Sequence, residues 1–206
     1  MTAPSIRHIL FPTDLSDCAE DAFSHAAFLA DCFGATLHIL HVREDPGFPP
    51  SDWSEALQIT VEDVAADLGL PLAPEADPFD LVDVQHTEVE SRDVAAAILH
   101  HAAAIEADLI VMGTHGRTGL GRAVMGSIAE AVVRHARCPV FTVGPASERG
   151  PWALTHVLVA VQEANPVPPQ AAWAARLAQA YGARIDLLRV VPPSLLASGA
   201  SDAARL

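Results

Sequence analysis

The chain contains no lysine, because all 12 of its basic residues are arginines. This absence excludes two kinds of site. A P-loop places a lysine against the β- and γ-phosphates of a nucleotide, and Schiff-base catalysis requires a lysine amine. Any phosphate that this protein binds must therefore be held by backbone amides, helix ends and arginine.

Cysteine and aromatic residues are also scarce. Cys18, Cys32 and Cys138 are widely spaced and form no C-x-x-C pair, which favours reduced thiols in a cytoplasmic protein. Aromatic residues make up 5% of the chain, so the core must be built from smaller apolar side chains. The N-terminal segment lacks the basic and apolar regions of a signal peptide, and we expect no membrane insertion because no apolar run is long enough to cross a bilayer.

Positive charge is in deficit, with 26 acidic residues against 12 basic ones and a net charge of −14. An acidic surface argues against nucleic acid as a partner and against binding to anionic membranes. Its simplest role is solubility. The length of 206 residues is enough for one domain with residues to spare.

Short apolar runs alternate with helix-like segments over the first 144 residues. Strands are predicted at residues 8–14, 35–42, 81–90, 108–113 and 138–143, the third of them nearer an edge. Helices are predicted at residues 16–34, 51–68, 91–107 and 126–138. We expect Ser16 or Asp17 to cap the first helix and Ser91 to cap the third. This alternation predicts an α/β fold with a doubly wound, five-stranded parallel sheet and helices on both faces.

A repeat of the first strand–helix–strand unit begins later in the chain. The segment from His156, HVLVAVQEAN, aligns without a gap on HILFPTDLSD from His8, and Gly182 then falls on Gly34. We predict a complete domain in residues 1–146, a linker in residues 147–153, and a partial, degenerate second copy in residues 154–206. Its apolar faces must dock on the first domain or on another chain, or stay weakly ordered.

Residues 111–130, VMGTHGRTGLGRAVMGSIAE, hold five of the 12 glycines. Gly113 and Gly116 follow a predicted buried strand, and Gly126 and Ser127 open a predicted helix after nine intervening residues. Glycine lets a backbone approach a ligand closely. A helix N-terminus adds free N–H groups and positive partial charge. The segment therefore predicts a phosphate cradle that needs no lysine.

These motifs resemble the universal stress protein family. The resemblance spans residues 6–144 and rests on FPTD at the tip of the first strand, ADLIVMGTHGR before the cradle and GSIAEAVVRHARCPVFTV after it. It implies a Rossmann-like, commonly dimeric domain in a stress-response protein, and members with this glycine pattern typically bind ATP. In the family the last strand, from Pro139 to Val143 here, commonly pairs across a dimer.

The resemblance also implies which residues contact the nucleotide. On the base and ribose side they are Pro12, Thr13, Asp14, Val42, Met112 and Gly113. On the phosphate side they are Gly116, Arg117, Gly126, Ser127, Ile128 and Ala129, the last two through helix N-terminal amides. His115 either bonds a phosphate or stabilises the loop. The second copy has Gln162 in place of Asp14 and no glycine-rich segment, so a single nucleotide site is predicted.

Some of these residues also fit simpler roles. Asp14 fits a carboxylate that only caps the following helix, and Ser127 fits an N-cap, which is compatible with phosphate binding because both use the same helix end. Arg117 is expected to pair with a phosphate. The chain departs from the family in having Ser91 and Arg92 where a glycine is usual near the start of the third helix.

We therefore expect an ATP-binding regulatory protein that acts through dimerisation and partner binding. The cofactor is ATP, with or without Mg²⁺, and the dimer forms through the strand from Pro139 to Val143, through the second copy, or through both. The alternatives are a slow ATPase or phosphotransferase and an interaction module without nucleotide binding. No Ser–His–Asp or metal-ligand spacing stands out, so we assign no catalytic residue and no metal site.

Overall fold

The computed structural model describes residues 5–44, 82–115, 125–144, 154–161 and 169–190. The chain divides into two compact units, one of residues 5–153 and the other of residues 154–206 together with the first four residues. The predicted helix at 51–68 lies outside the described residues, as do Gly116 and Arg117.

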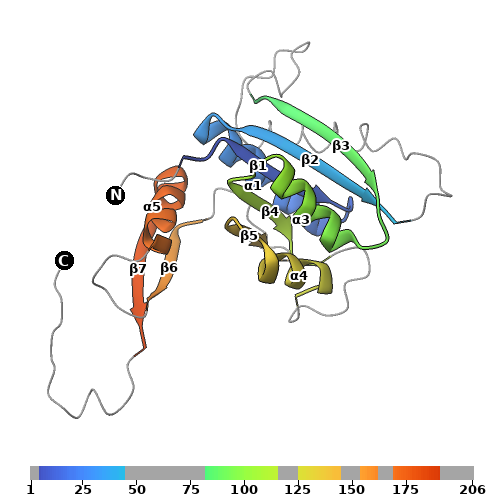
Figure 1. Ribbon diagram of the computed structural model, residues 1–206. Helices are drawn as coiled ribbons and strands as arrows, with labels where there is room; N and C mark the ends of the chain where they lie inside the picture. The colour runs from blue at the N-terminus through green and yellow to red at the C-terminus, as the bar shows by residue number, and fades with distance from the viewer. Residues whose placement is uncertain (1–4, 45–81, 116–124, 145–153, 162–168, 191–206) are drawn as a thin grey trace, which may run out of the picture. The chain divides into compact units, whose positions relative to one another are not determined.

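The first unit is a five-stranded parallel sheet with helices on both faces, as Figure 1 shows. Its strands are β1 (His8–Thr13), β2 (Thr36–Arg43), β3 (Val84–Glu90), β4 (Leu109–Gly113) and β5 (Val140–Val143). They lie in the order β3-β2-β1-β4-β5. The helices are α1 (Asp17–Phe33), α3 (Val94–Ala104) and α4 (Ser127–His135). The predicted α/β fold is confirmed, although β3 and β5 begin a few residues later than expected.

The burial of each strand follows from its place in the sheet. β1 and β4 are central, and their apolar residues are buried on both faces, with Ile9, Leu10 and Ile110 fully covered. Continuous apolar runs are typical of such strands. β3 lies at an edge, and its residues are intermediate or exposed. The polar alternation that predicted an edge position for this strand therefore has a clear cause.

α1 packs an alanine-rich face against the sheet. Its buried residues include Ala22, Ala26 and Phe23, and the Phe23 ring contacts that of Phe11 with centroids 5.3 Å apart. Small side chains allow the helix to lie close to the strands, so the core needs few aromatic residues. The helix ends at Gly34, which has the left-handed conformation, φ 61°, that glycine adopts at a helix C-terminus.

α3 and α4 cover the opposite face. One core cluster joins strand residues to helix residues, namely Leu10, Leu40, Ile110, Met112, Ile98, Ala102, Ala129 and Val132. The N-cap of α3 is Asp93, whose Oδ1 accepts a hydrogen bond from the Ala96 amide at 2.9 Å. The prediction that Ser91 caps this helix was wrong, because Ser91 Oγ bonds the backbone of Asp93 in the preceding turn.

The second unit contains β6 (His156–Val161), α5 (Pro169–Tyr181) and β7 (Arg184–Arg189). β6 and β7 pair in parallel, and Val159 and Val161 pack against Ala174 of α5. All six residues of β7 are exposed. The described part of this unit is therefore a small β-α-β element with a limited core.

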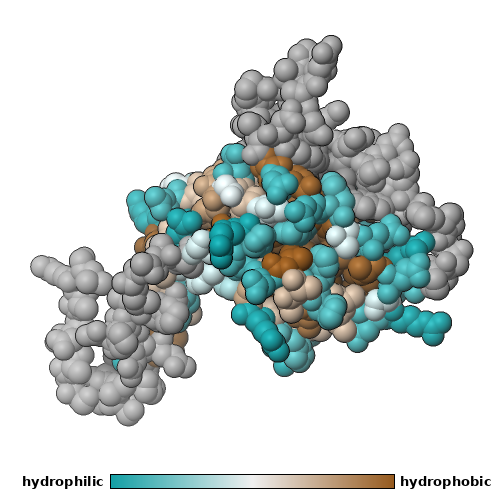
Figure 2. All heavy atoms as spheres, turned by 45° about the horizontal axis from the view of Figure 1, so that its top comes forward, coloured by the Kyte–Doolittle hydropathy of each residue, from teal (hydrophilic) through white to brown (hydrophobic). Residues whose placement is uncertain are grey.

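The surface of the described residues carries scattered apolar side chains. In the space-filling view of Figure 2, hydrophobic residues occur as separate patches among hydrophilic ones. On α4 the exposed large apolar residues are Ile128 and Val133. Among the described residues, no helix combines the length and apolar character that a membrane span requires.

Candidate functional site

The candidate site lies at the carboxyl edge of the first sheet, where the strand order reverses. From β1 the chain passes through α1 to β2 on one side, whereas β4 lies on the other side of β1. The loops that follow β1 and β4 therefore diverge at a topological switch point, the place where open α/β sheets bind ligands. The described residues of the implied set come from the ends of β1, β2 and β4 and from the start of α4.

The turn after β1 is held by its own polar groups. The Leu15 amide donates to Thr13 Oγ1 at 3.1 Å, while Ser16 donates to Asp14 Oδ1 through its amide at 3.2 Å and its hydroxyl at 2.6 Å. Leu15 has φ 61°, a left-handed conformation that is uncommon outside glycine and is found at functional sites. The turn therefore has a defined shape that places Asp14 next to the strand end.

This turn changes how the helix start is understood. Ser16 is the N-cap residue of α1 by backbone position, but its side chain makes no capping hydrogen bond. Its hydroxyl bonds Asp14 instead, so Ser16 occupies the predicted N-cap position without a side-chain bond to the helix backbone. Asp14 thus has a structural role in the turn, and this role is compatible with a ligand contact.

Apolar residues reach the carboxyl edge on the face that α3 and α4 cover. Met112 is 5% exposed and belongs to the core cluster beneath these helices, and Val42 packs against the same cluster. Pro12, two residues after Leu10 on β1, shares their face because side chains alternate along a strand. These three residues of the implied base side therefore lie on one face of the sheet.

Gly113 is required by the packing of the protein itself. A Cβ at this position would lie 2.9 Å from the backbone oxygen of Cys18 and 3.1 Å from its carbonyl carbon and its Sγ. Cys18 belongs to the first turn of α1 and donates its thiol hydrogen to the Val143 carbonyl at 3.3 Å. The glycine expected beside the nucleoside therefore also allows α1 to pack directly on the end of β4.

The chain before and after residues 116–124 meets at the start of α4. The Gly126 amide donates to the Thr114 carbonyl at 2.7 Å, and the Thr114 amide donates to the Val143 carbonyl at 2.8 Å. His115 Nδ1 lies 2.9 Å from Thr114 Oγ1, a contact within the loop. The end of β4 and the beginning of α4 are thus tied together by backbone groups.

The first turn of α4 faces the same edge with its amides. Gly126 is the N-cap residue and supplies no side chain, so Ser127 is the first helical residue and not the cap. Ser127 and Ile128 are exposed, while Ala129 is buried in the core cluster. The amides of a first turn have no partner within the helix, and the helix dipole gives them a positive partial charge. This end of α4 can therefore attract an anion.

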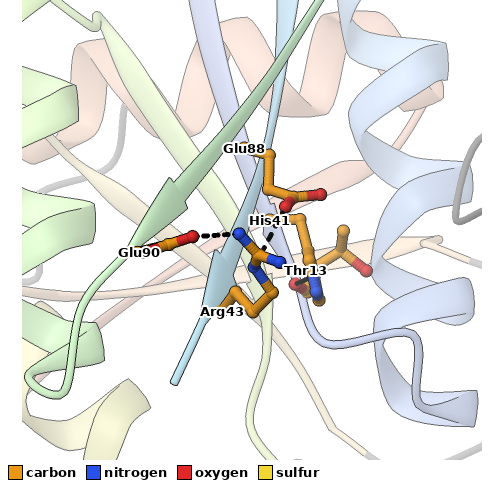
Figure 3. A network of polar contacts seen from close by, with 5 residues as sticks. All are labelled: Thr13, His41, Arg43, Glu88 and Glu90. Atoms are coloured by element: carbon orange, nitrogen blue, oxygen red, sulfur yellow. Dashed lines mark hydrogen bonds and ion pairs between the residues drawn. The ribbon is translucent and has the colours of Figure 1, made fainter. Parts of the chain in front are cut away.

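A polar network that sequence reasoning missed lies beside the β1 turn (Figure 3). His41 Nδ1 is 3.1 Å from the Thr13 backbone oxygen, and Arg43 forms ion pairs with Glu88, at 3.2 Å, and with Glu90. Alternation along β2 places His41 and Arg43 on one face in the sequence. Their partners depend on the register with β1 and β3, for which the sequence carries no direct signal.

The histidines and cysteines with displaced pKa values lie elsewhere in the unit. Burial lowers the pKa of His25 from the usual 6.5 to about 4. Burial and the neighbouring His8 and His101 lower the pKa of His38, whose Nε2 is 3.1 Å from His8 Nδ1. Among the described residues, no group of histidine, cysteine, aspartate and glutamate is arranged to hold a metal ion.

Residues 5–144 match the family model described as the universal stress protein family. The chain belongs to the universal stress protein family. Universal stress protein MJ0531 of Methanocaldococcus jannaschii is 34% identical over 140 residues, which cover 66% of this chain and 81% of that protein.

Two solved structures share the fold of this universal stress protein. One is protein PA1789 of Pseudomonas aeruginosa PAO1, which is described as functionally unknown. It has a TM-score of 0.66 at 20% identity, and the match covers 94% of this chain and 64% of that chain. The other is a universal stress protein in complex with cAMP, which has a TM-score of 0.51 at 22% identity. The match covers 69% of this chain and 100% of that chain. At these identities the likeness establishes the fold.

Proposed function

We propose that this universal stress protein binds ATP at the carboxyl edge of its first sheet and acts as a nucleotide-dependent regulatory protein. One observation carries the proposal: the turn after β1, the end of β4 and the open start of α4 converge at the switch point, with Gly126 bonded to Thr114. The related fold described in complex with cAMP adds support for an adenine nucleotide.

Each part of the edge suits one part of the nucleotide. Val42, which is partly exposed, offers apolar surface for the base, and Met112 packs in the core beside it. Asp14 offers a carboxylate for ribose hydroxyls, and the α4 amides from Ser127 onward offer donors and partial positive charge for phosphates. Arg117 lies outside the described residues. In this proposal it supplies a full positive charge for the phosphates, since the chain has no lysine.

We also propose that residues 154–206 are a partial second copy of the family domain. β6 and β7 pair with the same residue separation as β1 and β2. Gly34 and Gly182 end their helices with φ of 61° and 65°. Ala35 and Ala183, the residues after these glycines, each donate to a carbonyl five residues back. The likeness to PA1789, which covers 94% of this chain, is consistent with this proposal.

The regulatory role requires a state that the nucleotide alters, and we propose a homodimer in the cytoplasm. β5 is an edge strand whose described pairing is with β4 alone, so one side of Val140–Val143 is open to a partner strand. The second unit, with its exposed β7, is a further candidate surface. Cys18, Cys32 and Cys138 are free thiols, as expected in a reducing compartment.

Calorimetry with the full chain tests the nucleotide site directly. ATP, ADP and AMP are titrated with and without Mg²⁺ into the wild type, Arg117→Gln and the control Arg134→Gln. Arg134 is exposed on α4 and pairs with Glu130, so its loss removes the same charge outside the proposed phosphate site. We expect ATP to bind the wild type and Arg134→Gln, and to bind Arg117→Gln about tenfold more weakly, the loss of one charge-assisted contact.

Three results would count against this proposal. If no nucleotide gave a heat of binding with the wild type, the alternative of an interaction module without nucleotide binding would be favoured. Steady phosphate release from ATP would favour the hydrolytic alternative. A molar mass in solution equal to that of one chain, with and without ATP, would contradict the proposed homodimer.

A further inference from the structure

The carboxyl end of β1 is positioned mainly from one side. The pairing of β1 with β4 joins Ile9 and Leu10 to their partners, whereas its pairing with β2 continues to Thr13, which lies opposite His41. The last residues of β1 before the candidate site therefore take their position from β2. A group on β2 that holds Thr13 determines where the following turn lies.

His41 is that group. Its Nδ1 lies 3.1 Å from the backbone oxygen of Thr13. Because a carbonyl oxygen can only accept, Nδ1 must carry the hydrogen and donate it. Thr13 is 8% exposed and already paired in the β1–β2 ladder, and the imidazole adds a side-chain donor to its carbonyl. Figure 3 shows the imidazole beside Thr13 at the ends of the two strands.

On the other side of β2, charged residues of β3 lie beside His41 in the sheet register. Glu88 lies directly opposite His41 in the β2–β3 register, and the Arg43 Nε is 3.2 Å from Glu88 Oε1. The side chains of Arg43 and Glu88 are 17% and 20% exposed, so this pair is largely shielded from solvent. β2 thus contacts both of its neighbours here, through His41 to the end of β1 and through Arg43 to the edge strand β3.

The position of Thr13 is passed on to the turn. Thr13 Oγ1 accepts from the Leu15 amide, and Leu15 is held in its left-handed conformation between Asp14 and Ser16. The Ser16 amide and hydroxyl in turn hold the Asp14 carboxylate. A shift of the Thr13 peptide would therefore move Asp14 as well.

We propose that His41 is a positioning residue for the nucleotide, acting through its hydrogen bond to the Thr13 carbonyl. It sets the turn of residues 13–16, and with it the Asp14 carboxylate, without contacting the ligand. This inference rests on the proposed function, because the turn is assigned to the base and ribose side of the ATP site. It adds β2 to the parts of the fold on which affinity depends.

The experiment uses ATP calorimetry on the full chain with His41→Leu, His41→Asn and the control His100→Leu, since His100 is exposed on α3. An asparagine amide can donate from nearly the position of Nδ1, whereas leucine cannot. We expect His41→Leu to weaken ATP binding about five- to tenfold, the loss of one buried hydrogen bond. His41→Asn should stay within about twofold of wild type, because it keeps that bond.

Amide hydrogen exchange of the ligand-free protein gives a readout that does not depend on ATP. The Leu15 and Ser16 amides should exchange faster in His41→Leu and at the wild-type rate in His41→Asn. Equal ATP affinity of His41→Leu and His100→Leu, or an Asn variant as weak as the Leu variant, would overturn the role of His41 while leaving the ATP site intact. A wild type that binds no nucleotide would overturn the proposed function itself, and the positioning role with it.

Discussion

The contact between Gly113 and Cys18 makes Gly113→Ala the most informative single change. Gly113 does not have positive φ, so alanine is allowed by the backbone. Its lower entropy in the unfolded chain would by itself stabilise the fold by about 0.4–1 kcal/mol. The added Cβ, however, would lie 2.9 Å from the Cys18 backbone oxygen. Relieving such overpacking costs about 1–3 kcal/mol, so we expect net destabilisation.

Alanine variants of two other glycines serve as controls that distinguish this clash from the general effects of replacing glycine with alanine. At Gly144 the nearest atom to a new Cβ is Thr114 Oγ1 at 3.9 Å, an ordinary contact, so Gly144→Ala should be neutral or slightly stabilising. At Gly34 a new Cβ meets nothing within 4 Å, but φ is +61°. Gly34→Ala should therefore lose about 1 kcal/mol through backbone strain alone.

Urea unfolding of the three variants, followed by far-ultraviolet circular dichroism, measures the order of stabilities. A crystal structure of Gly113→Ala should show α1 displaced from the end of β4. Cys18→Ala in the same background should not restore stability, because the closest atoms are the backbone oxygen and carbon of Cys18. If Gly113→Ala were as stable as Gly144→Ala and α1 had not moved, the close-packing argument would be refuted.

Two further predictions concern titration and capping. Burial lowers the pKa of His25 from 6.5 to about 4, so the unfolded chain binds a proton below pH 6.5 that the folded chain does not; the free energy of unfolding should fall by up to about 3 kcal/mol between those two pH values. Urea midpoints across this range should show a flatter pH dependence in His25→Leu, and an unchanged slope would contradict the burial of a neutral imidazole. Asp93→Ala should cost about 1 kcal/mol because α3 loses its cap, whereas Asp93→Asn should cost little; equal urea midpoints for these two variants would show that the Ala96 hydrogen bond contributes nothing.

Much of the fold follows from local features of the chain. Apolar runs of strand length, separated by segments with helical spacing, are enough to predict a parallel α/β sheet, because both signals are local and repeat along the sequence. The left-handed glycine that ends α1 is another local signal, since few residues other than glycine adopt that conformation. The glycine-rich segment likewise marks the carboxyl edge of β4 as the candidate site.

Neighbours across strands could not be predicted in this way. His41 bonds Thr13 and lies opposite Glu88 only because β2 sits between β1 and β3 in one register. Nothing in the local sequence of β2 carries that register. The cap of α3 shows the same limit on a smaller scale, because Ser91 and Asp93 both suit an N-cap and the turn geometry selects Asp93.

The sequence by itself therefore determined the family, the strand–helix order and the edge of the sheet where a ligand is expected, because each depends on residue types at fixed spacing. The tertiary structure decided what the individual residues do there. It assigned Gly113 to a contact with Cys18, Ser16 to Asp14 and His41 to Thr13. These roles arise from distances between segments far apart in the chain or from the path of a turn, and such distances exist only once the sheet and helices have packed.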